Sequence, residues 1–415
     1  MALKGFAGSL SLALEERRRL RSPTLLDIAI ADRFSQLSEA AWVQVTAAGS
    51  FFHSAAYQRA FERFRPPNIE PRFALISRGD TPLAAVCLQI ARIDLTQVGE
   101  GSRRKKLRLH QLSSKLGQRI LICGNLLAYG LHGVCFAPGT EADRDLIWNA
   151  VAEVLYRVRR AEKLAGSADL VLIKDLDDRA KSESVVLKKL SYGPVPTEPN
   201  MVLALDAAWR THADYLGSLT SKYRSDIKNR IFKKFDESGC AVERLTDAAP
   251  LGETLHALYL QVHGNATLRP FTLPATYWSG LAEAGGTNVV IHTARQGERI
   301  LGFIVSLKDG DTAFAYHIGF DRAAAESGIP IYLRLLHASL AQAIEFGGCR
   351  RVSFGRTALE PKARMGCVPE PTYIWARHRH PMLNQIVQPL LKLIEHDVAP
   401  EFTPFKTAET TKSKA

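Results

Sequence analysis

The chain has 415 residues but no uninterrupted apolar run of the 18 or so that a membrane-spanning helix needs. The longest candidate, 120–136, is interrupted by glycines, Asn125 and His132, so we interpret it as a buried strand. The weakly apolar stretch 1–14 is followed by two glutamates and three arginines, where a signal peptide would have small residues before its cleavage site. Both absences argue against a membrane-spanning or secreted protein.

Cysteine pairs and the common nucleotide and hydrolase motifs are also missing. The six cysteines include no CxxC pair and sit mostly in apolar surroundings, which predicts free thiols in a reducing, cytoplasmic location. No GxxxxGK[ST], GxGxxG, HExxH or GxSxG phrase occurs. His378 and His380 fall on one strand face without a nearby cysteine or carboxylate, so we expect no metal site.

Positive charge is in excess, with 54 Lys and Arg against 42 Asp and Glu, a net charge of +12. Such an excess favours phosphate-bearing partners in general, whether nucleotide cofactors, RNA or anionic lipid, without choosing among them. The densest cluster, Arg103 to Arg108, contains no aromatic residue and is typical of a solvated loop.

The length predicts two domains, and the pattern of elements repeats. In the first half, a hairpin turning at Gly79 precedes the buried run 120–136, a helix over 143–161 and a strand over 169–173. In the second half, strands over 288–293, 299–307 and 312–320, the first two turning at Gly297, precede a helix over 330–346 and a strand over 350–354. We therefore predict two diverged copies of one unit, the alternative being two unrelated α+β domains.

The predicted boundaries are a peripheral segment at 1–22, units at 23–205 and 206–390, and a helix end with a disordered tail at 391–415. Between the copies, 211–235 has apolar residues at spacings of three and four and predicts one basic amphipathic helix. Its basic face is either a solvated surface or the lining of a groove for phosphate or an acidic acceptor.

The most informative segment ends one strand and opens the next helix, with Ser327-Gly-Ile-Pro330 between them. Pro330 suits the first helical turn, and Ser327 or Gly328 is the expected N-cap. Free backbone amides and the helix dipole make such an end suitable for a pyrophosphate.

After this helix come Ser353-Phe-Gly-Arg356 and Pro361-Lys-Ala-Arg-Met-Gly366. Residues 310–366 resemble the C-terminal half of GNAT-superfamily acyltransferases, and more narrowly the branch of the Fem-type peptidoglycan aminoacyltransferases and acetyltransferase-like proteins of polysaccharide synthesis. That branch has phrases like Asp-Phe-Gly-Arg-Gly and Tyr-Lys-x-x-Phe-Gly, for which this chain has Ser353 and Pro361 in place of the Asp and the Tyr. The resemblance implies an α/β (α+β) fold of two tandem GNAT-like units, each a mixed, mostly antiparallel sheet flanked by helices.

The resemblance also implies where a donor would bind. Acetyl-CoA or another acyl-CoA would be the co-substrate, held by Ser327, Gly328, Ile329, Pro330 and Ile331 at the helix start and by Arg356, Lys362 and Arg364 beyond the last strand. Lys222, Tyr223 and Arg224 resemble a Lys-x-Arg phrase of Fem-like proteins, which implies substrate contact.

Among the remaining polar residues, His317 is the first choice of general base because an imidazole titrates near pH 7. On a regular strand the neighbouring Tyr316 would face the opposite side. Asp321 is a candidate for orienting an acceptor amine, with a turn residue as the alternative, and Glu360 is a weaker candidate base.

The leading hypothesis is a cytoplasmic acyltransferase that moves an acyl group from acyl-CoA to an amine or hydroxyl of a sugar, amino acid or cell-envelope precursor. Fem-like aminoacyl transfer from charged tRNA is the first alternative, although no sustained heptad run suggests the coiled-coil arm common in Fem-type enzymes. A non-catalytic GNAT-like scaffold that binds an envelope partner or RNA is the second. Peripheral contact with a membrane is compatible with all three.

Overall fold

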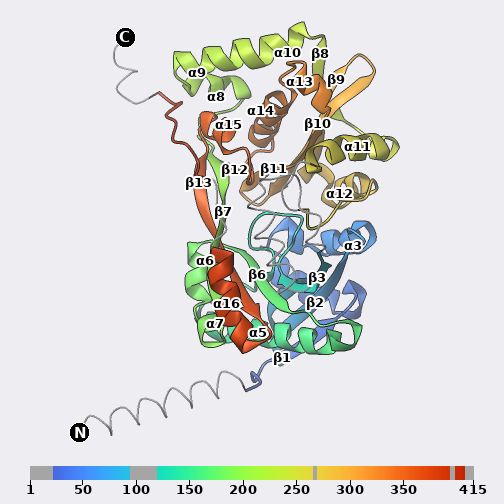
Figure 1. Cartoon of the computed structure of the whole chain (residues 1–415), viewed down its shortest axis with the longest axis vertical. Helices are drawn as coiled ribbons and strands as arrows, with labels where there is room; N and C mark the ends of the chain where they lie inside the picture. The colour runs from blue at the N-terminus through green and yellow to red at the C-terminus, as the bar shows by residue number, and fades with distance from the viewer. Residues whose placement is uncertain (1–21, 94–118, 265–268, 393–397, 407–415) are drawn as a thin grey trace, which may run out of the picture.

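The computed structural model of the chain describes residues 22–93, 119–264, 269–392 and 398–406. Its strands form one continuous sheet in the order β1-β2-β3-β4-β6-β13-β7-β12-β11-β10-β9-β8, with β5 beside β3 (Figure 1). Only the pairs β4–β6 and β11–β12 run parallel in this sheet. The predicted mixed, mostly antiparallel sheet flanked by helices is confirmed.

The N-terminal half contributes the first seven strands and five of the described α-helices. The strands are β1 (Asp27–Ala31), β2 (Ile69–Arg78), β3 (Thr81–Arg92), β4 (Arg119–Cys123), β5 (Val134–Phe136), β6 (Leu170–Leu176) and β7 (Gly193–Ala204). The helices are α2 (Glu39–Thr46), α3 (Ala55–Phe64), α5 (Arg144–Ala161), α6 (Asp178–Glu183) and α7 (Val186–Lys189).

The C-terminal half contributes the other strands and most of the helices. The strands are β8 (Cys240–Leu245), β9 (Val289–Gln296), β10 (Arg299–Asp309), β11 (Thr312–Phe320), β12 (Arg351–Ser353) and β13 (Val368–His378). The helices are α8 (His212–Ser218), α9 (Ser221–Asp226), the π-helix η5 (Ile227–Lys233), α10 (Lys234–Glu237), α11 (Gly252–His263), α12 (Tyr277–Gly285), α13 (Arg322–Glu326), α14 (Ile331–Glu345), α15 (Leu359–Arg364) and α16 (Pro381–Lys392).

The two halves repeat one arrangement. In the first, the hairpin β2–β3 leads to β4, then α5, then β6, which lies parallel to β4. In the second, the hairpin β9–β10 leads to β11, then α14, then β12, which lies parallel to β11. The predicted order of elements is thus present in both halves.

The two halves are joined by their last strands, because each of these strands pairs with strands of the other half. β7, the last strand of the first unit, pairs with β12 through Val202 to Ala204. β13, from the second unit, pairs with β6 on one side and with β7 on the other. Each unit therefore completes its sheet with the help of the other.

Two predicted elements are divided in the structure. The run 120–136 is not one strand: β4 ends at Cys123 and β5 begins at Val134, because Gly124 and Gly130, at φ +141° and +115°, turn the chain into a loop. The predicted helix over 211–235 is also interrupted. The backbone is extended at Leu219 and Thr220, where Leu219 forms a β-bridge with Phe405.

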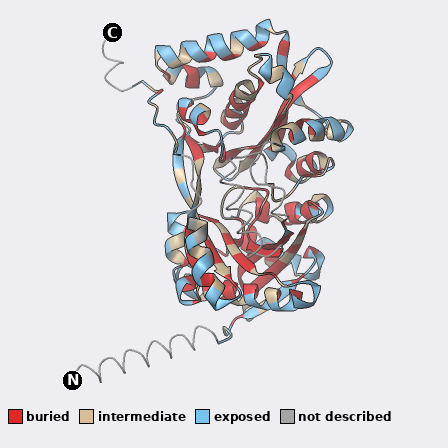
Figure 2. Cartoon of the chain, in the orientation of Figure 1, coloured by how far each residue is buried: buried red, intermediate tan, exposed pale blue. Residues whose placement is uncertain are grey.

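The buried residues form layers on the sheet, and one layer spans both halves (Figure 2). In this shared core, Phe52 and Tyr57 of the first half pack with Tyr277 and Tyr316 of the second. The Tyr277 and Tyr316 hydroxyls are 2.9 Å apart, and Asn125 Nδ2 donates to the Tyr57 hydroxyl at 2.8 Å. The contact between the halves is therefore buried, aromatic and hydrogen-bonded.

All six cysteines are free thiols, and all but Cys349 are buried. A search of the described residues finds no helix with both the length and the apolar character to cross a bilayer. The basic cluster Arg103 to Arg108 lies outside the described residues, as do 1–21 and the tail 407–415.

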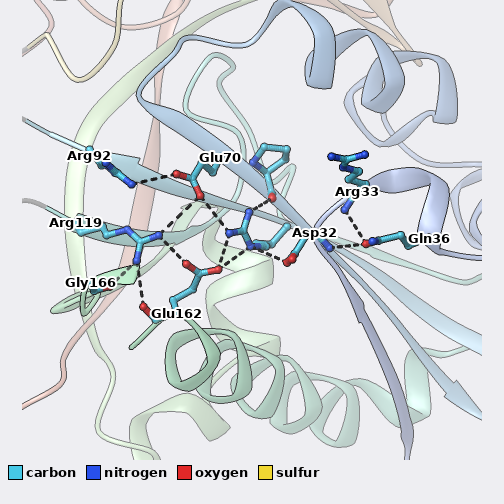
Figure 3. Close-up of polar contacts among 10 residues, drawn as sticks. Asp32, Arg33, Gln36, Glu70, Arg92, Arg119, Glu162 and Gly166 are labelled. Carbon is cyan, nitrogen blue, oxygen red and sulfur yellow. Dashed lines mark hydrogen bonds and ion pairs between the residues drawn. The ribbon is translucent and has the colours of Figure 1, made fainter. Parts of the chain in front are cut away.

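A network of ion pairs ties β2, β3 and β4 to the turn after α5 (Figure 3). Glu162 accepts hydrogen bonds from Arg72 and Arg119, both at 2.6 Å, and Glu70 lies beside the same arginines. Burial favours the neutral form of Glu162, but the two arginines outweigh it and lower the pKa of this carboxyl. The network therefore holds a charged carboxylate against the end of the sheet.

We predict that Glu162→Gln lowers the free energy of unfolding at pH 7 by about 2 kcal/mol, because it removes the carboxylate that is hydrogen-bonded to both buried guanidinium groups and leaves them only their contacts with Glu70 and, for Arg72, with Asp32. The matched control Glu283→Gln breaks only the exposed pair with Arg63 and should cost less than about 1 kcal/mol. Urea unfolding measures both. Because the pKa of Glu162 is lowered in the folded state, the difference should shrink as the pH falls through that pKa. Equal costs for the two variants would contradict this role for Glu162.

Candidate active site

The parallel strands β11 and β12 separate soon after they pair. They are in register over only three residue pairs, from Thr312 with Arg351 to Phe314 with Ser353. β11 continues beside β10 as far as Phe320, whereas the chain after Ser353 turns toward β7, where the Phe354 amide donates to the Met201 carbonyl. Within the described residues, the edge of β11 that faces this wedge therefore has no strand partner beyond Phe314.

Helix α14 starts against the same part of the sheet. A Cβ atom at Gly302 of β10 would lie 2.8 Å from Ile331 Cγ2, so the first helical turn rests closely on the strand. The first turn of α14 contains no acidic residue. Its backbone amides and the helix dipole therefore present uncompensated partial positive charge.

The expected N-cap at Ser327 or Gly328 is wrong. The N-cap residue of α14 is Pro330, without a side-chain hydrogen bond, because the short helix α13 intervenes. Ser327 is instead the C-cap of α13, and its hydroxyl donates to the Ala324 carbonyl at 2.7 Å. The predicted residues 327–331 still lie together at the start of α14.

The basic segment α9–η5–α10 packs beside α14. Ile227, Ile231 and Phe235 join the core cluster that includes Ile331 and Leu335 of α14. Lys222 is exposed, and Tyr223 and Arg224 are half-buried, with an Arg224 guanidinium nitrogen donating to the Leu219 carbonyl at 3.3 Å.

The end of this basic segment reaches the start of α14. Lys234 Nζ lies 3.2 Å from the position that a Cβ atom would take at Gly328, which has φ +101°. The structure therefore brings one cation of the basic segment to the predicted donor site.

His317 and Tyr316 lie on the same side of the sheet, which corrects the expectation for a regular strand. Val305 of β10 pairs with His317, and the next residue, Ser306, pairs with Ala315, so Tyr316 is an extra residue in a β-bulge. The Tyr316 and His317 rings are consequently only 4.1 Å apart, measured between their centroids.

His317 is enclosed by the aromatic residues of α11 and α12. Its ring lies within 6.5 Å of Tyr259 and within 5.8 Å of Tyr277 and Trp278. Its Nε2 atom is buried and has no hydrogen-bond partner within the described part of the chain. Burial, with a smaller effect from His263, lowers the pKa of His317 to about 3, so the imidazole is neutral at pH 7.

Asp321 serves as a helix cap in this structure. Its carboxylate accepts from the Ala324 amide at 3.0 Å and pairs with Arg299. The backbone hydrogen bond from Ala324 is the main cause of its lowered pKa. This geometry matches the alternative of a turn residue and leaves the carboxylate engaged.

Arg356 lies in a cleft of about 420 Å³ between the two halves. The cleft is lined by the loop 129–131, the end of β6 with the start of α6, and residues of β7, β11, β12 and β13. Asp175 is fully buried here between Lys174 and Arg356, and Arg356 also donates to the Thr372 hydroxyl at 3.0 Å. The lining is therefore polar and carries charges of both signs.

Backbone strain is concentrated beside this cleft. Three of the four non-glycine residues with positive φ in the described chain are Asp175, Thr357 and Ala358, at +56°, +68° and +45°. Gly355 has φ +70°, and a Cβ atom there would lie 2.7 Å from the Tyr129 ring. Strain of this kind is retained when the surrounding structure fixes it, commonly at functional sites.

Lys362 and Arg364 occupy different surroundings. Lys362 is only 3% exposed, and its ammonium donates to the carbonyl oxygens of Arg356 and Thr357 at 2.8 and 2.7 Å. Arg364 pairs with Glu360 one helical turn earlier, at 2.9 Å. Because the Lys362 ammonium is enclosed by carbonyl groups, it holds the strained loop rather than facing a ligand, and we leave it out of the donor site.

Sequence reasoning missed the residues that the first half brings to the cleft. Tyr129 comes from a glycine-rich loop, and Asp175, Asp177 and Asp178 follow a predicted strand. Acidic residues clustered after a buried strand were the available signal. Their meeting with Arg356, 181 positions away from Asp175, depends on how the halves join.

Comparison with known proteins agrees with this geometry. Residues 221–362 match the family model described as an acetyltransferase (GNAT) domain. No curated protein matches the chain. Among solved structures, FemX is similar with a TM-score of 0.52 and 11% identity, over 87% of this chain and 100% of FemX.

Two other solved structures are similar at lower scores. A tandem GNAT protein from the clavulanic acid biosynthesis pathway has a TM-score of 0.46 at 13% identity, over 86% of this chain and 99% of that one. The C-terminal domain of a putative lysylphosphatidylglycerol synthetase from Agrobacterium fabrum has a TM-score of 0.46 at 10% identity, over 84% and 95%.

The fold defines a chain of two units of similar arrangement built on one sheet, and the acetyltransferase (GNAT) domain model matches the chain within the second. Residues 221–362 are thus similar to an acetyltransferase (GNAT) domain, and the fold of the chain as a whole is similar to that of FemX.

We predict that stability falls as the pH is lowered from about 6.5 toward 4. Burial lowers the pKa of six histidines well below the ordinary 6.5: His53, His132, His212, His292, His317 and His337. In this range the unfolded chain takes up protons that the folded chain does not, at about 1.4 kcal/mol per pH unit for each residue. Thermal unfolding of His317→Gln should show a smaller loss between pH 7 and 5 than the wild type. An unchanged pH dependence would show that His317 is not buried in its neutral form.

Proposed function

We propose that the protein transfers an acyl group from acyl-CoA to an amine or hydroxyl of a sugar, amino acid or cell-envelope precursor. The donor binds in the wedge between β11 and β12, with its diphosphate at the start of α14, and the acceptor binds in the central cleft. The observation that carries this proposal is that Phe314 and Ser353, where the wedge opens, also line the cleft. Donor and acceptor would then meet where the two strands separate.

The equivalent wedge in the first unit argues for a single donor site. After β4 and β6 pair, the loop 124–133 closes the space between them: Lys174 Nζ of β6 donates to the Ala128 carbonyl at 2.7 Å. The start of α5 also carries acidic residues, with Glu141, Asp143 and Asp145 before and within its first turn. These carboxylates would repel a phosphate group at the start of α5. The first turn of α14 carries no carboxylate at the equivalent place.

The chemistry needs a polarised acyl carbonyl and an acceptor for one proton. Backbone N–H groups on the free edge of β11 supply donors for the carbonyl oxygen. His317 is the proposed base, because its Nε2 has no partner within the described chain and can accept a proton. Its lowered pKa makes it a weak base in the free protein, so the role requires the bound acceptor to raise that pKa. A buried nitrogen without a partner fits a group that completes its hydrogen bonding with the substrate.

We predict that Gly328→Glu weakens binding of acetyl-CoA at least tenfold, because it places a carboxylate at the start of α14. The matched control is Gly297→Glu, which adds the same charge at another glycine with positive φ, in the hairpin turn between β9 and β10. Isothermal titration calorimetry with acetyl-CoA and longer acyl-CoAs measures both variants.

The outcome separates the proposals. Binding that Gly328→Glu loses and Gly297→Glu keeps supports the acyl-CoA site. Failure of the wild type to bind any acyl-CoA would overturn it. Salt-sensitive binding of tRNA that Gly328→Glu leaves unchanged would favour either aminoacyl transfer or a binding scaffold.

One observation favours tRNA as a second candidate donor. The segment α9–η5–α10 exposes Lys222, Lys228 and Lys234, and Lys234 lies beside the start of α14. Exposed cations along a helical segment suit a phosphate backbone, and their binding would weaken steeply with salt. Lys222→Glu and Lys228→Glu should then reduce tRNA binding while leaving acyl-CoA binding unchanged.

A further inference from the structure

A chain of hydrogen bonds crosses from the second half of the molecule to the loop that lines the cleft. Asp309, at the end of β10, lies 2.5 Å from the Ser50 hydroxyl through Oδ2, and its Oδ1 accepts from the Phe51 amide at 2.7 Å. Ser50 Oγ lies 3.1 Å from His132 Nδ1, and His132 Nε2 lies 2.8 Å from the Tyr129 carbonyl oxygen. Two side chains thus connect Asp309 to the backbone of Tyr129.

Counting protons along this chain constrains its protonation. A carbonyl oxygen only accepts, so His132 Nε2 carries a hydrogen and donates to Tyr129. In a neutral imidazole Nδ1 is then an acceptor, and the Ser50 hydroxyl must donate to it. That hydroxyl has one hydrogen, so the short contact with Asp309 is a hydrogen bond only if the carboxyl group is the donor. The only other way to form all of these hydrogen bonds is with His132 as an imidazolium and Asp309 as a carboxylate.

The surroundings distinguish these two forms. Burial lowers the pKa of His132 to about 3, helped by the neighbouring His53, which disfavours the imidazolium. Burial also raises the pKa of Asp309 and outweighs the hydrogen bonds from Ser50 and Phe51, which lower it; Asp311 adds a smaller effect in the raising direction. Two charged residues near Asp309 in sequence are engaged elsewhere: Asp311 is paired with Arg350, and Lys308 donates to the Phe346 and Gly347 carbonyls. Neither therefore stabilises an ionised Asp309.

We propose that Asp309 is a protonated carboxylic acid in this arrangement and that, through Ser50 and His132, it positions Tyr129 at the cleft. The role at the cleft rests on the proposed function, whereas the protonated state does not. When Asp309 ionises, the Ser50 hydroxyl must turn to the carboxylate, and the hydrogen bond to His132 is lost.

Loss of the hydrogen bond between Ser50 and His132 would affect the position of Tyr129. Its ring packs against Gly355, leaving no room for a Cβ atom, and the Arg356 guanidinium lies 5.4 Å from the ring centroid. A shift of Tyr129 would therefore move the strained loop after β12 and the arginine that holds Asp175. Asp309 is a positioning residue, because it reaches the cleft only through other side chains.

Asp309→Asn tests the protonated state directly. The amide retains an acceptor for the Phe51 amide and a donor for Ser50, so it imitates the carboxylic acid and cannot ionise. We expect this variant to unfold at the same or a higher urea concentration than the wild type at pH 5, and to exceed the wild type by a wider margin at pH 8. The sign follows because a carboxyl group whose pKa is raised on folding costs stability progressively as the pH rises from its unfolded pKa to its folded pKa, whereas the amide does not ionise. Asp309→Ala, which removes both hydrogen bonds, should unfold earlier at both pH values.

Asp311→Asn is the matched control, because Asp311 is two residues away and is held ionised by Arg350. It should lose stability relative to the wild type by a similar amount at pH 5 and at pH 8, because both values lie above the pKa of Asp311 in the folded and the unfolded chain. Infrared difference spectra of the wild type against Asp309→Asn should show the C=O stretch of a protonated carboxylic acid. Absence of that band at pH 5, or Asp309→Asn as unstable there as Asp309→Ala, would overturn the proposal.

These readouts need no ligand, so they stand even where the acyl-CoA assignment fails. The positioning role is tested by the Michaelis constant for the acceptor as a function of pH. We expect it to rise with pH in the wild type and to stay constant in Asp309→Asn. A Michaelis constant that rises with pH in both the wild type and Asp309→Asn would overturn the link to Tyr129.

Discussion

The exchange of the last strands is the constraint on which the rest of the structure depends. β13 lies between β6 of the first unit and β7, and β7 continues the ladder to β12 of the second. Neither unit can complete its sheet alone, so the two cannot separate without breaking long ladders of backbone hydrogen bonds. The orientation of the units is thereby fixed, and with it the distance between the ends of β6 and β12. The central cleft exists because these two ends meet, joined by the Asp175–Arg356 pair.

The aromatic core shared by the two halves also fixes the orientation of the units. The tyrosines of both halves share one core, in which burial raises the pKa of Tyr57 to about 12 despite hydrogen bonds from Asn125 and other tyrosines. Buried hydroxyl groups of this kind favour one arrangement, because a displaced hydroxyl loses its hydrogen-bond partner inside the core. Rigid placement matters for transfer chemistry, because reacting groups must be held within a few tenths of an ångström of their productive positions.

The local pattern of the sequence was enough to predict the repeated order of hairpin, strand, helix and strand. Turn glycines such as Gly297, and the 3.6-residue period of α5 and α14, depend only on neighbours in sequence. The predicted helix start at 327–331 was likewise in place, although Pro330 and not Ser327 is the N-cap. The bulge at Tyr316 could not be predicted, because it is a property of register with β10. The cleft was missed for a similar reason, since Asp175 and Arg356 come together only through strand exchange.

The two units diverged through small changes at equivalent places. In the first, Lys174 and the loop 124–133 close the wedge, and carboxylates mark the start of α5. In the second, the wedge has no such loop among the described residues, and α14 begins without acids. The loop that closes the first wedge also supplies Tyr129 to one wall of the cleft. Under the proposed function, the same loop would therefore both exclude a donor from the first unit and shape the acceptor site beside the second.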